Sequence, residues 1–382
     1  MNKLKIPGHT SGALNYPIYN SSSFFFDSIE AIEDVFSFKQ QGYIYTRGGN
    51  PTVNQLEDIV ASLEGGNSAV AFSSGMGAIS STLMGLLRPG DHLICLSIIY
   101  GTAKHFIRQM LDNYGIEISY VGAEEFGQIE RYIKENTKII FFETPCNPTL
   151  EDICIKTVRA KSRSDIKIVV DNTMLSPIFQ RPLSLGADIV IHSMTKYLSG
   201  HADVLGGIAI SNDRELINKI KFDSMCLLGN CLSPLSADAI MKGIKTLPLR
   251  MMAHANNTAK IIQFLENNPI VEEVLYPGKK SSQSIQSQVL GIGGVISFRV
   301  RLTEDEIREF FKKLKKTYIS VSYGDEFSII QYPLYMTHRE YLENANNLYA
   351  KKLHGLIRLA VGHSNVEECI QDIDQALREV ER

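Results

Sequence analysis

Hydrophobic and polar positions follow two different patterns between residues 50 and 247. Short apolar runs rich in β-branched residues alternate with longer segments in which apolar residues recur every three or four positions. The short runs predict buried strands, and the longer segments predict amphipathic helices. The predicted strands are 68–74, 92–97, 118–122, 138–144, 167–173, 187–193 and 206–211, and the predicted helices include 77–87, 103–114 and 124–136. This alternation predicts an α/β fold with a mostly parallel sheet and helices on both faces.

The pattern changes at both ends of this region. Residues 1–49 mix Gly, Ser, Asn and aromatic residues without a period, which predicts an irregular arm. Beyond about residue 247, the predicted helices are longer, and one is interrupted at Pro248. The predicted strands there are 294–300, 318–324 and 355–362, and the predicted helices are 304–314 and 366–380. We therefore expect an arm (1–49), a large domain (50–247) and a smaller α+β domain (248–382).

Composition narrows the classes of partner. The 382 residues are 44% hydrophobic and 21% charged, with a net charge of -3, which gives no field to attract nucleic acid or anionic lipid. The first twenty residues contain no apolar stretch long enough for a signal peptide or membrane span, so we expect a cytoplasmic protein. The six cysteines show no CxxC pairing and no metal-ligand spacing with the histidines, so we expect reduced thiols and no metal catalysis.

Two charged residues follow predicted strands and give the first indication of chemistry. Lys196 comes just after the predicted strand 187–193, and Asp171 ends the apolar part of the predicted strand 167–173. Ligands of open α/β sheets bind at the carboxyl ends of the strands. A lysine there is by itself more often a surface residue, but a lysine and a carboxylate a pyridine ring apart suit pyridoxal phosphate. The lysine forms the Schiff base, and the acid keeps the ring nitrogen protonated.

A phosphate site is also predicted. The segment "AVAFSSGMGAIS" reads as a strand, a Ser/Gly turn and a helix start, so the amides around Gly75 and Met76 can point at an anion. Ser193 and Thr195 flank the lysine and can add hydroxyl donors.

Eight motifs, in order, resemble those of the pyridoxal-phosphate-dependent enzymes of cysteine and methionine metabolism, which include cystathionine γ-lyase, cystathionine γ-synthase and methionine γ-lyase. They are "YTRGGNPT" (45–52), "SSGMGA" (73–78), "ETPCNPTL" (143–150), "DNT" (171–173), "SMTKYLSGHAD" (193–203), "GIKTLPLRM" (243–251), "PLYMTH" (333–338) and "IRLAVG" (357–362). The resemblance covers nearly the whole chain and implies the aspartate-aminotransferase-like fold, known as fold type I.

The resemblance also implies roles for the cofactor-binding residues. Lys196 is then the Schiff-base lysine, and Asp171 is the partner of the pyridine nitrogen. The implied phosphate ligands are Gly75, Met76, Ser193 and Thr195 of one subunit with Tyr45 and Arg47 of the neighbouring subunit. Shared sites of this kind require at least a homodimer, and we expect a homodimer or homotetramer.

Further implied roles concern the substrate. Tyr100 stacks on the cofactor ring and takes part in proton transfer, and Asn147 lies by the cofactor's 3-oxygen. Arg358, helped by Ser322, binds the substrate carboxylate through its fork of donors.

Departures from the family pattern bear on the substrate. Thr102 stands where methionine γ-lyases carry a reactive cysteine, and the family's Ser-Leu-Gly-Gly segment reads "SYGDEFS" here. Met225 and Cys226 replace a Lys-Asp pair of those enzymes, and Tyr332 replaces the family's histidine. Val321 stands where members acting on cystathionine tend to have glutamate. An apolar residue there favours a small uncharged γ-substituent, although core packing is an equal explanation.

We expect γ-elimination on a sulfur amino acid or a homoserine derivative, giving a 2-oxo acid and ammonia. The departure at Thr102 leaves open whether methionine is the substrate. The alternatives are γ-replacement on an O-acyl-homoserine and, more distantly, a relative that binds the cofactor without catalysis.

Overall fold

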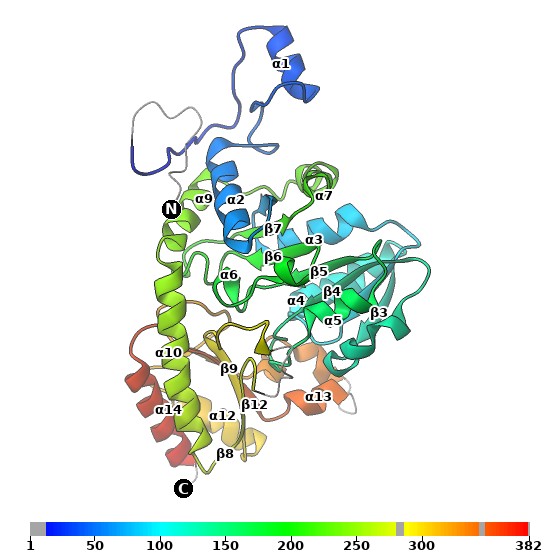
Figure 1. Cartoon of the computed structure of the whole chain (residues 1–382). Coiled ribbons are helices and arrows are strands. Elements are labelled where there is room, and N and C mark those ends of the chain that lie inside the picture. The colour runs from blue at the N-terminus through cyan, green and yellow to red at the C-terminus, as the bar shows by residue number, and fades with distance from the viewer. Residues whose placement is uncertain (1–12, 280–285, 344–347, 381–382) are drawn as a thin grey trace.

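Seven strands form the larger sheet of the computed structural model, which describes residues 13–279, 286–343 and 348–380 (Figure 1). The strands are β1 (Ser68–Phe72), β2 (His92–Leu96), β3 (Glu117–Val121), β4 (Thr137–Glu143), β5 (Lys167–Asp171), β6 (Ile189–Ser193) and β7 (Gly207–Ser211). Their order is β1-β7-β6-β5-β4-β2-β3, and only β7 runs antiparallel to its neighbours. The carboxyl ends of β2 to β6 therefore meet at one edge.

Helices cover both faces of this sheet. Successive strand residues point to opposite faces. His192 contacts Glu64 of α2 (Pro51–Glu64), whereas a Cβ on Gly75 of α3 (Gly75–Leu86) would touch Ser193. Adjacent residues of β6 thus meet helices on opposite sides. The other helices of this part are α4 (Gly101–Phe106), α5 (Ile155–Lys161), α6 (Ser176–Phe179), α7 (Arg214–Ile220), α8 (Cys226–Leu228) and α9 (Pro234–Ile244), with π-helical turns at Ile107–Leu111 and Lys221–Met225 and a 3-10 turn at Pro182–Leu185.

A second, smaller sheet has the order β10-β11-β12-β9-β8 and is antiparallel except between β10 and β11. Its strands are β8 (Val271–Leu275), β9 (Val295–Val300), β10 (Tyr318–Ile319), β11 (Ile329–Gln331) and β12 (Leu356–Ala360). The helices around it are α10 (Leu247–Glu266), α12 (Glu304–Lys313), α13 (Leu348–Leu353) and α14 (Val366–Val380), with 3-10 turns at Pro333–Tyr335 and Arg339–Glu343. The long helix α10 runs past both sheets and contacts α6, β8 and β9 (Figure 1).

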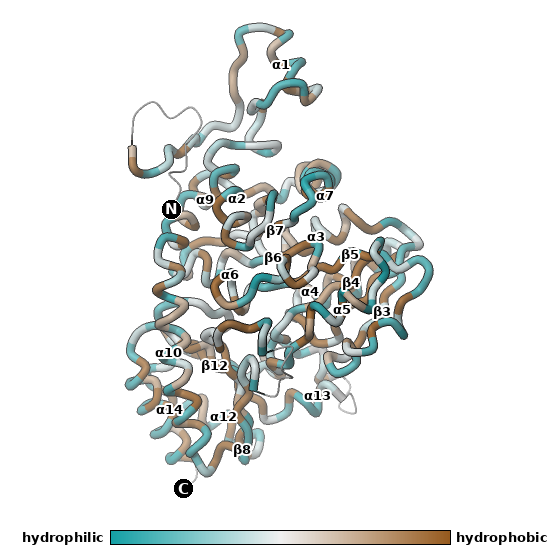
Figure 2. Tube along the Cα trace, viewed as in Figure 1, coloured by the Kyte–Doolittle hydropathy of each residue, from teal (hydrophilic) through white to brown (hydrophobic). Residues whose placement is uncertain are grey.

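The core follows from the apolar runs. Ile189, Val190 and Ile191 of β6 are all fully buried, and burying such a side chain contributes about 2 kcal/mol. Figure 2 shows hydrophobic colouring through the middle of the molecule and more hydrophilic colouring on peripheral helices such as α7. Among the described residues, no helix is both long and apolar enough to cross a membrane. The mostly parallel sheet with helices on both faces and the smaller second sheet confirm the predicted fold class.

Some local predictions were wrong. The predicted helix 124–136 is a 3-10 segment (Ala123–Tyr132) that is broken at Gln128, where φ is -132°, next to the helix-weakening Gly127. The predicted strand 318–324 ends at Ile319, because Ser322 and Gly324 adopt positive φ. Strands β8 and β11 were not predicted. The arm is mostly irregular but holds one helix, α1 (Ile29–Phe36), capped by Ser28.

Candidate active site

The candidate site lies where three parallel strands end. β4 ends at Glu143, β5 at Asp171 and β6 at Ser193. Glu143 and Asp171 are direct neighbours in the register of β4 and β5. Lys196 follows β6 in a tight turn, in which its amide donates to the Ser193 carbonyl at 3.2 Å. The sheet topology thus brings the predicted lysine and acid to the same edge.

Lys196 is held as an amine that loses its proton easily. Its Nζ donates to Ser322 Oγ at 2.7 Å and lies 5.5 Å from the centre of the Tyr323 ring. Burial, and then the positive charge of Arg358, lower the pKa of Lys196 to about 8, although Asp171 opposes this. A neutral amine is the nucleophile and base that covalent catalysis by lysine requires.

Asp171 is fixed by its neighbour Thr173. The Thr173 amide and hydroxyl both donate to Asp171 Oδ1, at 2.9 and 2.5 Å. Burial raises the pKa of Asp171, while the bonds from Thr173 and the charges of His192 and Lys196 counteract that effect. These bonds fix the orientation of the carboxyl group.

The turn before α3 and the end of β6 form a close cup. Ser74 caps α3 by accepting from the Gly77 amide at 3.0 Å, and a Cβ on Gly75 would lie 2.7 Å from Ser193 Cβ. The Thr195 hydroxyl accepts from the Gly206 amide at 3.1 Å. Met76 lines an adjacent hollow of about 590 Å³. The amides at the start of α3, with these hydroxyls, suit an anion such as phosphate.

Arg358 reaches the site from the smaller sheet. Its guanidinium donates to Asn147 Oδ1 at 3.1 Å and to the Ser322 carbonyl at 2.8 Å. With its amide oxygen facing Arg358, Gln331 accepts from Nε at 3.1 Å. Burial lowers the pKa of Arg358 to about 10. Within the described part of the chain no carboxylate forms an ion pair with this cation, which suits a carboxylate-bearing ligand.

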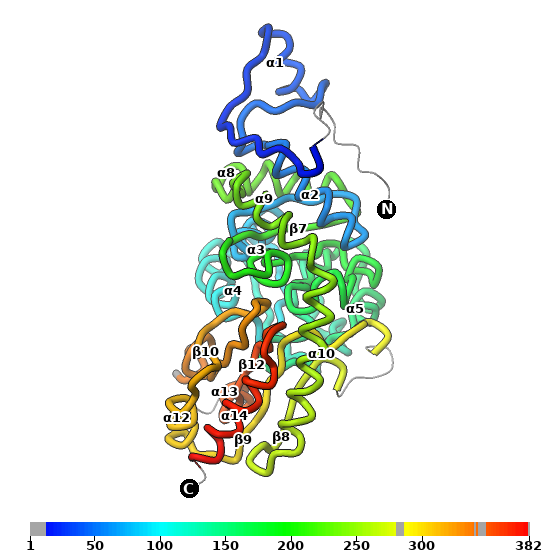
Figure 3. Tube along the Cα trace, turned by 90° about the vertical axis from the view of Figure 1, so that its left-hand side faces the viewer, coloured from blue at the N-terminus to red at the C-terminus, as the bar shows by residue number. Residues whose placement is uncertain are grey.

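The remaining predicted residues lie around this centre or apart from it. Tyr100 precedes α4 and is 41% exposed, and Val321 beside Ser322 is 50% exposed. Tyr45 and Arg47 lie on the arm, where the guanidinium carbon of Arg47 is 5.4 Å from the centre of the Tyr45 ring. Figures 1 and 3 both show the arm extending from the body of the molecule. No contact links these two residues to the described residues around Lys196.

Sequence reasoning missed Glu143, Thr173 and Gln331. Glu143 accepts from the Tyr100 amide at 2.6 Å, and burial followed by the charge of Asp171 raises its pKa to about 8. A signal for Glu143 was present, because it ends an apolar run as Asp171 does. Gln331 could be found only from its pairing with Arg358 across β11 and β12.

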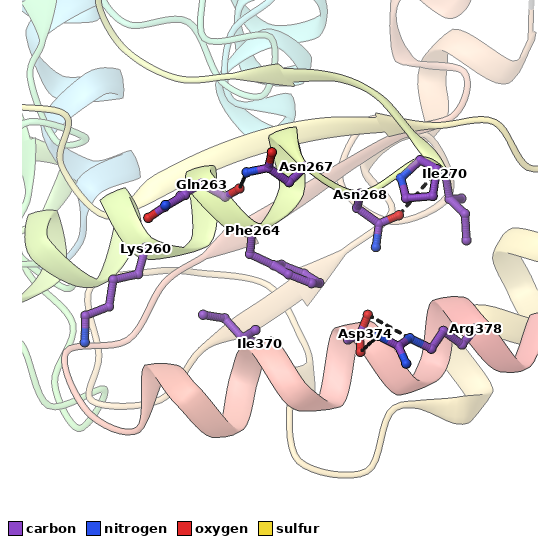
Figure 4. A pocket seen from close by; sticks show the side chains of 10 residues that line it. Lys260, Gln263, Phe264, Asn267, Asn268, Ile270, Ile370, Asp374 and Arg378 are labelled. Carbon is purple, nitrogen blue, oxygen red and sulfur yellow. Dashed lines mark hydrogen bonds and ion pairs between the residues drawn. The ribbon is translucent and has the colours of Figure 1, made fainter.

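A larger groove of about 670 Å³ lies elsewhere, between the end of α10 and α14 (Figure 4). Its lining includes Phe264, Ile370 and Asp374, and it contains none of the predicted site residues. No set of three described His, Cys, Asp or Glu residues is placed to hold a metal ion.

The residues present fit pyridoxal phosphate. Lys196 offers an easily deprotonated amine that can react with the cofactor aldehyde, and Asp171 offers a fixed carboxyl group for the ring nitrogen. Gly75 leaves space at the start of α3, next to Ser193, that a Cβ would fill. The fold and this set of side chains define a pyridoxal-phosphate enzyme of fold type I.

The comparisons place the chain more narrowly. It belongs to the family described as Cys/Met metabolism PLP-dependent enzyme, which matches residues 3–378. It is 39% identical to the L-methionine gamma-lyase of Fusobacterium nucleatum subsp. polymorphum over 97% of this chain and 94% of the relative. It is 38% identical to the cystathionine gamma-lyase of Bacillus subtilis (strain 168), over 97% and 96%. The crystal structure of metB from Corynebacterium glutamicum superposes with a TM-score of 0.90 at 35% identity, covering 98% and 96%. The predicted family and cofactor are thereby confirmed.

Proposed function

We propose that the chain is a carbon–sulfur lyase that carries out γ-elimination on a sulfur amino acid or a related homoserine derivative, giving a 2-oxo acid and ammonia. The observation that carries this proposal is the placement of Lys196 and Arg358 on either side of Ser322. A base and a carboxylate-binding cation are thereby linked through one residue, as two groups that act on the same α-amino acid would be. The similarity to methionine and cystathionine gamma-lyases supports the reaction class.

The side chains divide the work. Bound pyridoxal phosphate supplies the electron sink that stabilises negative charge at the substrate Cα. Lys196 removes the Cα proton, since its pKa of about 8 leaves a usable fraction of neutral amine near neutral pH. Asp171 holds a proton on the ring nitrogen, and Arg358 fixes the substrate carboxylate. Tyr100, at the start of α4, gives a proton to the departing γ-substituent.

The arm completes the site of a neighbouring subunit in this proposal. Tyr45 and Arg47 form part of an extended arm that exposes large apolar residues. Among them, Phe25 is 91% exposed and Phe38 is 76% exposed. Exposed apolar surface of this kind is typical of a segment that packs against another chain. The guanidinium of Arg47 is suited to a phosphate held by the α3 cup of the second copy.

The apolar residue at position 321 favours substrates with an uncharged leaving group. It stands half exposed beside Ser322, whose hydroxyl contacts Lys196. A hydrogen bond to a charged group is worth roughly 1.5 to 3 kcal/mol, so the lack of glutamate at this position disfavours cystathionine by about ten- to a hundredfold. We expect methionine, homocysteine or an O-acyl-homoserine to be preferred.

A substrate panel tests the proposal. Purified protein loaded with pyridoxal phosphate is given methionine, homocysteine, O-acetyl-homoserine or cystathionine, with and without an added thiol. Release of 2-oxobutanoate and ammonia is the expected result, and Lys196→Ala is the inactive control. The variant Val321→Glu should shift preference towards cystathionine. Preference of the wild type for cystathionine would refute the role of Val321, and thioether formation faster than 2-oxo acid release would indicate γ-replacement instead.

A further inference from the structure

We propose that Glu143 is a positioning residue of the active site, because its single carboxyl group holds together the turn that carries Tyr100 and the loop that carries Asn147. The inference rests on the proposed function, in which Tyr100 and Arg358 act on the substrate. It concerns a residue to which neither the motifs nor the comparisons assign a role.

The carboxyl group of Glu143 bridges two separate loops. It is only 7% exposed at the end of β4. Its Oε1 accepts from the Tyr100 amide at 2.6 Å, and its Oε2 lies 3.4 Å from the donating Asn147 amide. Tyr100 follows β2 and Asn147 follows β4, so one side chain sets the spacing of two loops at the carboxyl edge. The shorter bond, to Tyr100, is the stronger restraint.

The bridge continues to the substrate-binding arginine. Asn147 accepts from Arg358 Nη1 at 3.1 Å, and Arg358 also donates to the Ser322 carbonyl. Glu143 therefore stands at one end of a chain of contacts that reaches Arg358 through the Asn147 loop. The Tyr100 amide also donates to the Glu143 carboxyl group. Glu143 therefore helps to position both Tyr100, the proton donor, and Arg358, the cation that binds the substrate carboxylate.

The neutral form of Glu143 is the one that suits this place. Glu143 and Asp171 are register neighbours, and burial together with the charge of Asp171 raises the pKa of Glu143 to about 8. The other titratable groups that interact with Glu143 are Cys95, Cys146 and Tyr323, whose pKa values are all raised by burial. At neutral pH these three groups are uncharged, so the electrostatic effect on Glu143 comes from Asp171, whose own pKa is also raised by burial. A protonated carboxyl keeps an acceptor for Tyr100 without adding a second negative charge beside Asp171.

Two substitutions separate positioning from general stability. Glu143→Gln keeps an acceptor for the Tyr100 amide, the shorter of the two bonds, and loses the acceptor for the Asn147 amide, whereas Glu143→Ala removes both acceptors. The matched control is Glu57→Ala, because Glu57 is equally buried and accepts one backbone amide, that of Ala71 at 2.8 Å, rather than the amides of Tyr100 and Asn147. Each variant, loaded with pyridoxal phosphate, is compared by chemical unfolding, by visible circular dichroism of the bound cofactor, and by kcat and KM across pH.

Both alanine variants should unfold more easily, because each leaves a buried amide without its partner. Only Glu143→Ala should change the visible dichroism and lower kcat, by about a hundredfold for a misplaced catalytic group. Glu143→Gln should keep the visible dichroism and the order of magnitude of kcat. In the wild type, ionisation of Glu143 near pH 8 should lower kcat as the pH rises. This part of the decline should be missing from the kcat–pH profile of Glu143→Gln.

Two results would overturn the inference. One is unchanged dichroism and kcat in a folded Glu143→Ala protein, and the other is a Glu143→Gln protein with the wild-type alkaline limb. If Glu143→Ala does not fold, Glu143→Gln still decides through its dichroism and pH profile. A wild-type protein that releases no 2-oxo acid would refute the proposed function, whereas the dichroism comparison would still test Glu143.

Discussion

Replacing Lys196 by methionine should stabilise the cofactor-free protein while abolishing turnover. Burial and the charge of Arg358 lower the pKa of Lys196 from 10.5 to about 8. Each pKa unit corresponds to 1.36 kcal/mol, so keeping this ammonium in the folded state costs up to about 3 kcal/mol at neutral pH. Losing the Lys196–Ser322 hydrogen bond offsets about 1 kcal/mol. A methionine that fills the same space should therefore raise the free energy of unfolding by about 2 kcal/mol.

The pH dependence has a definite sign. A base whose pKa is lowered in the folded state destabilises that state fully below the folded pKa, and the penalty disappears as the pH rises to the unfolded pKa. The advantage of Lys196→Met should be complete at pH 7, smaller at pH 9 and nearly absent at pH 10.5.

The measurement is urea unfolding of cofactor-free protein, followed by far-ultraviolet circular dichroism at these three pH values. Lys245→Met is the control, because Lys245 is exposed and its hydrogen bond goes to Asn15 on the arm. A variant no more stable than wild type at pH 7, or an advantage that does not shrink as the pH rises, would refute the argument from desolvation.

Two further predictions concern the cofactor. Arg47→Ala and Lys196→Ala should each have little or no activity. Subunit exchange between the two variants should restore part of the activity, because a hybrid dimer contains one site with both residues intact. No recovery after verified exchange would contradict a shared site. Gly75→Ala should weaken cofactor binding by about five- to a hundredfold in equilibrium dialysis, because its Cβ would lie 2.7 Å from a neighbouring carbon, and overpacking costs about 1 to 3 kcal/mol. Gly127→Ala, where the added carbon meets nothing within 4 Å, should bind the cofactor as wild type does.

The chemistry that could be predicted from sequence sits at the ends of strongly patterned strands. Asp171 directly follows the apolar run Ile168–Val170, and Lys196 comes shortly after Ile191. Both therefore had to lie at the same edge once the two strands were parallel. Glu143 ends β4 in the same way, but its relation to Tyr100 depends on the crossing of two loops, which no local pattern encodes.

Local structure that depends on neighbouring segments of the chain was missed by the sequence analysis. The three residues of β11 form a strand because they lie between β10 and β12, and their own sequence is too short to show a period. Ser322 adopts a φ of 93°, a conformation that side-chain-bearing residues seldom take, so the predicted strand through it could not persist. That same turn places the Ser322 hydroxyl against Lys196 and its carbonyl against Arg358.

The attachment of Val321 and Ser322 has a consequence for how this protein could acquire new substrates. These residues follow β10, a two-residue strand at the border of the small sheet, whereas the anion cup is built into the large sheet by α3 and β6. Changes at the border leave the core of either sheet untouched. In the proposed function, variation at Val321 can therefore change the preferred leaving group without altering the residues that build the anion cup, so new substrate preferences should arise there first.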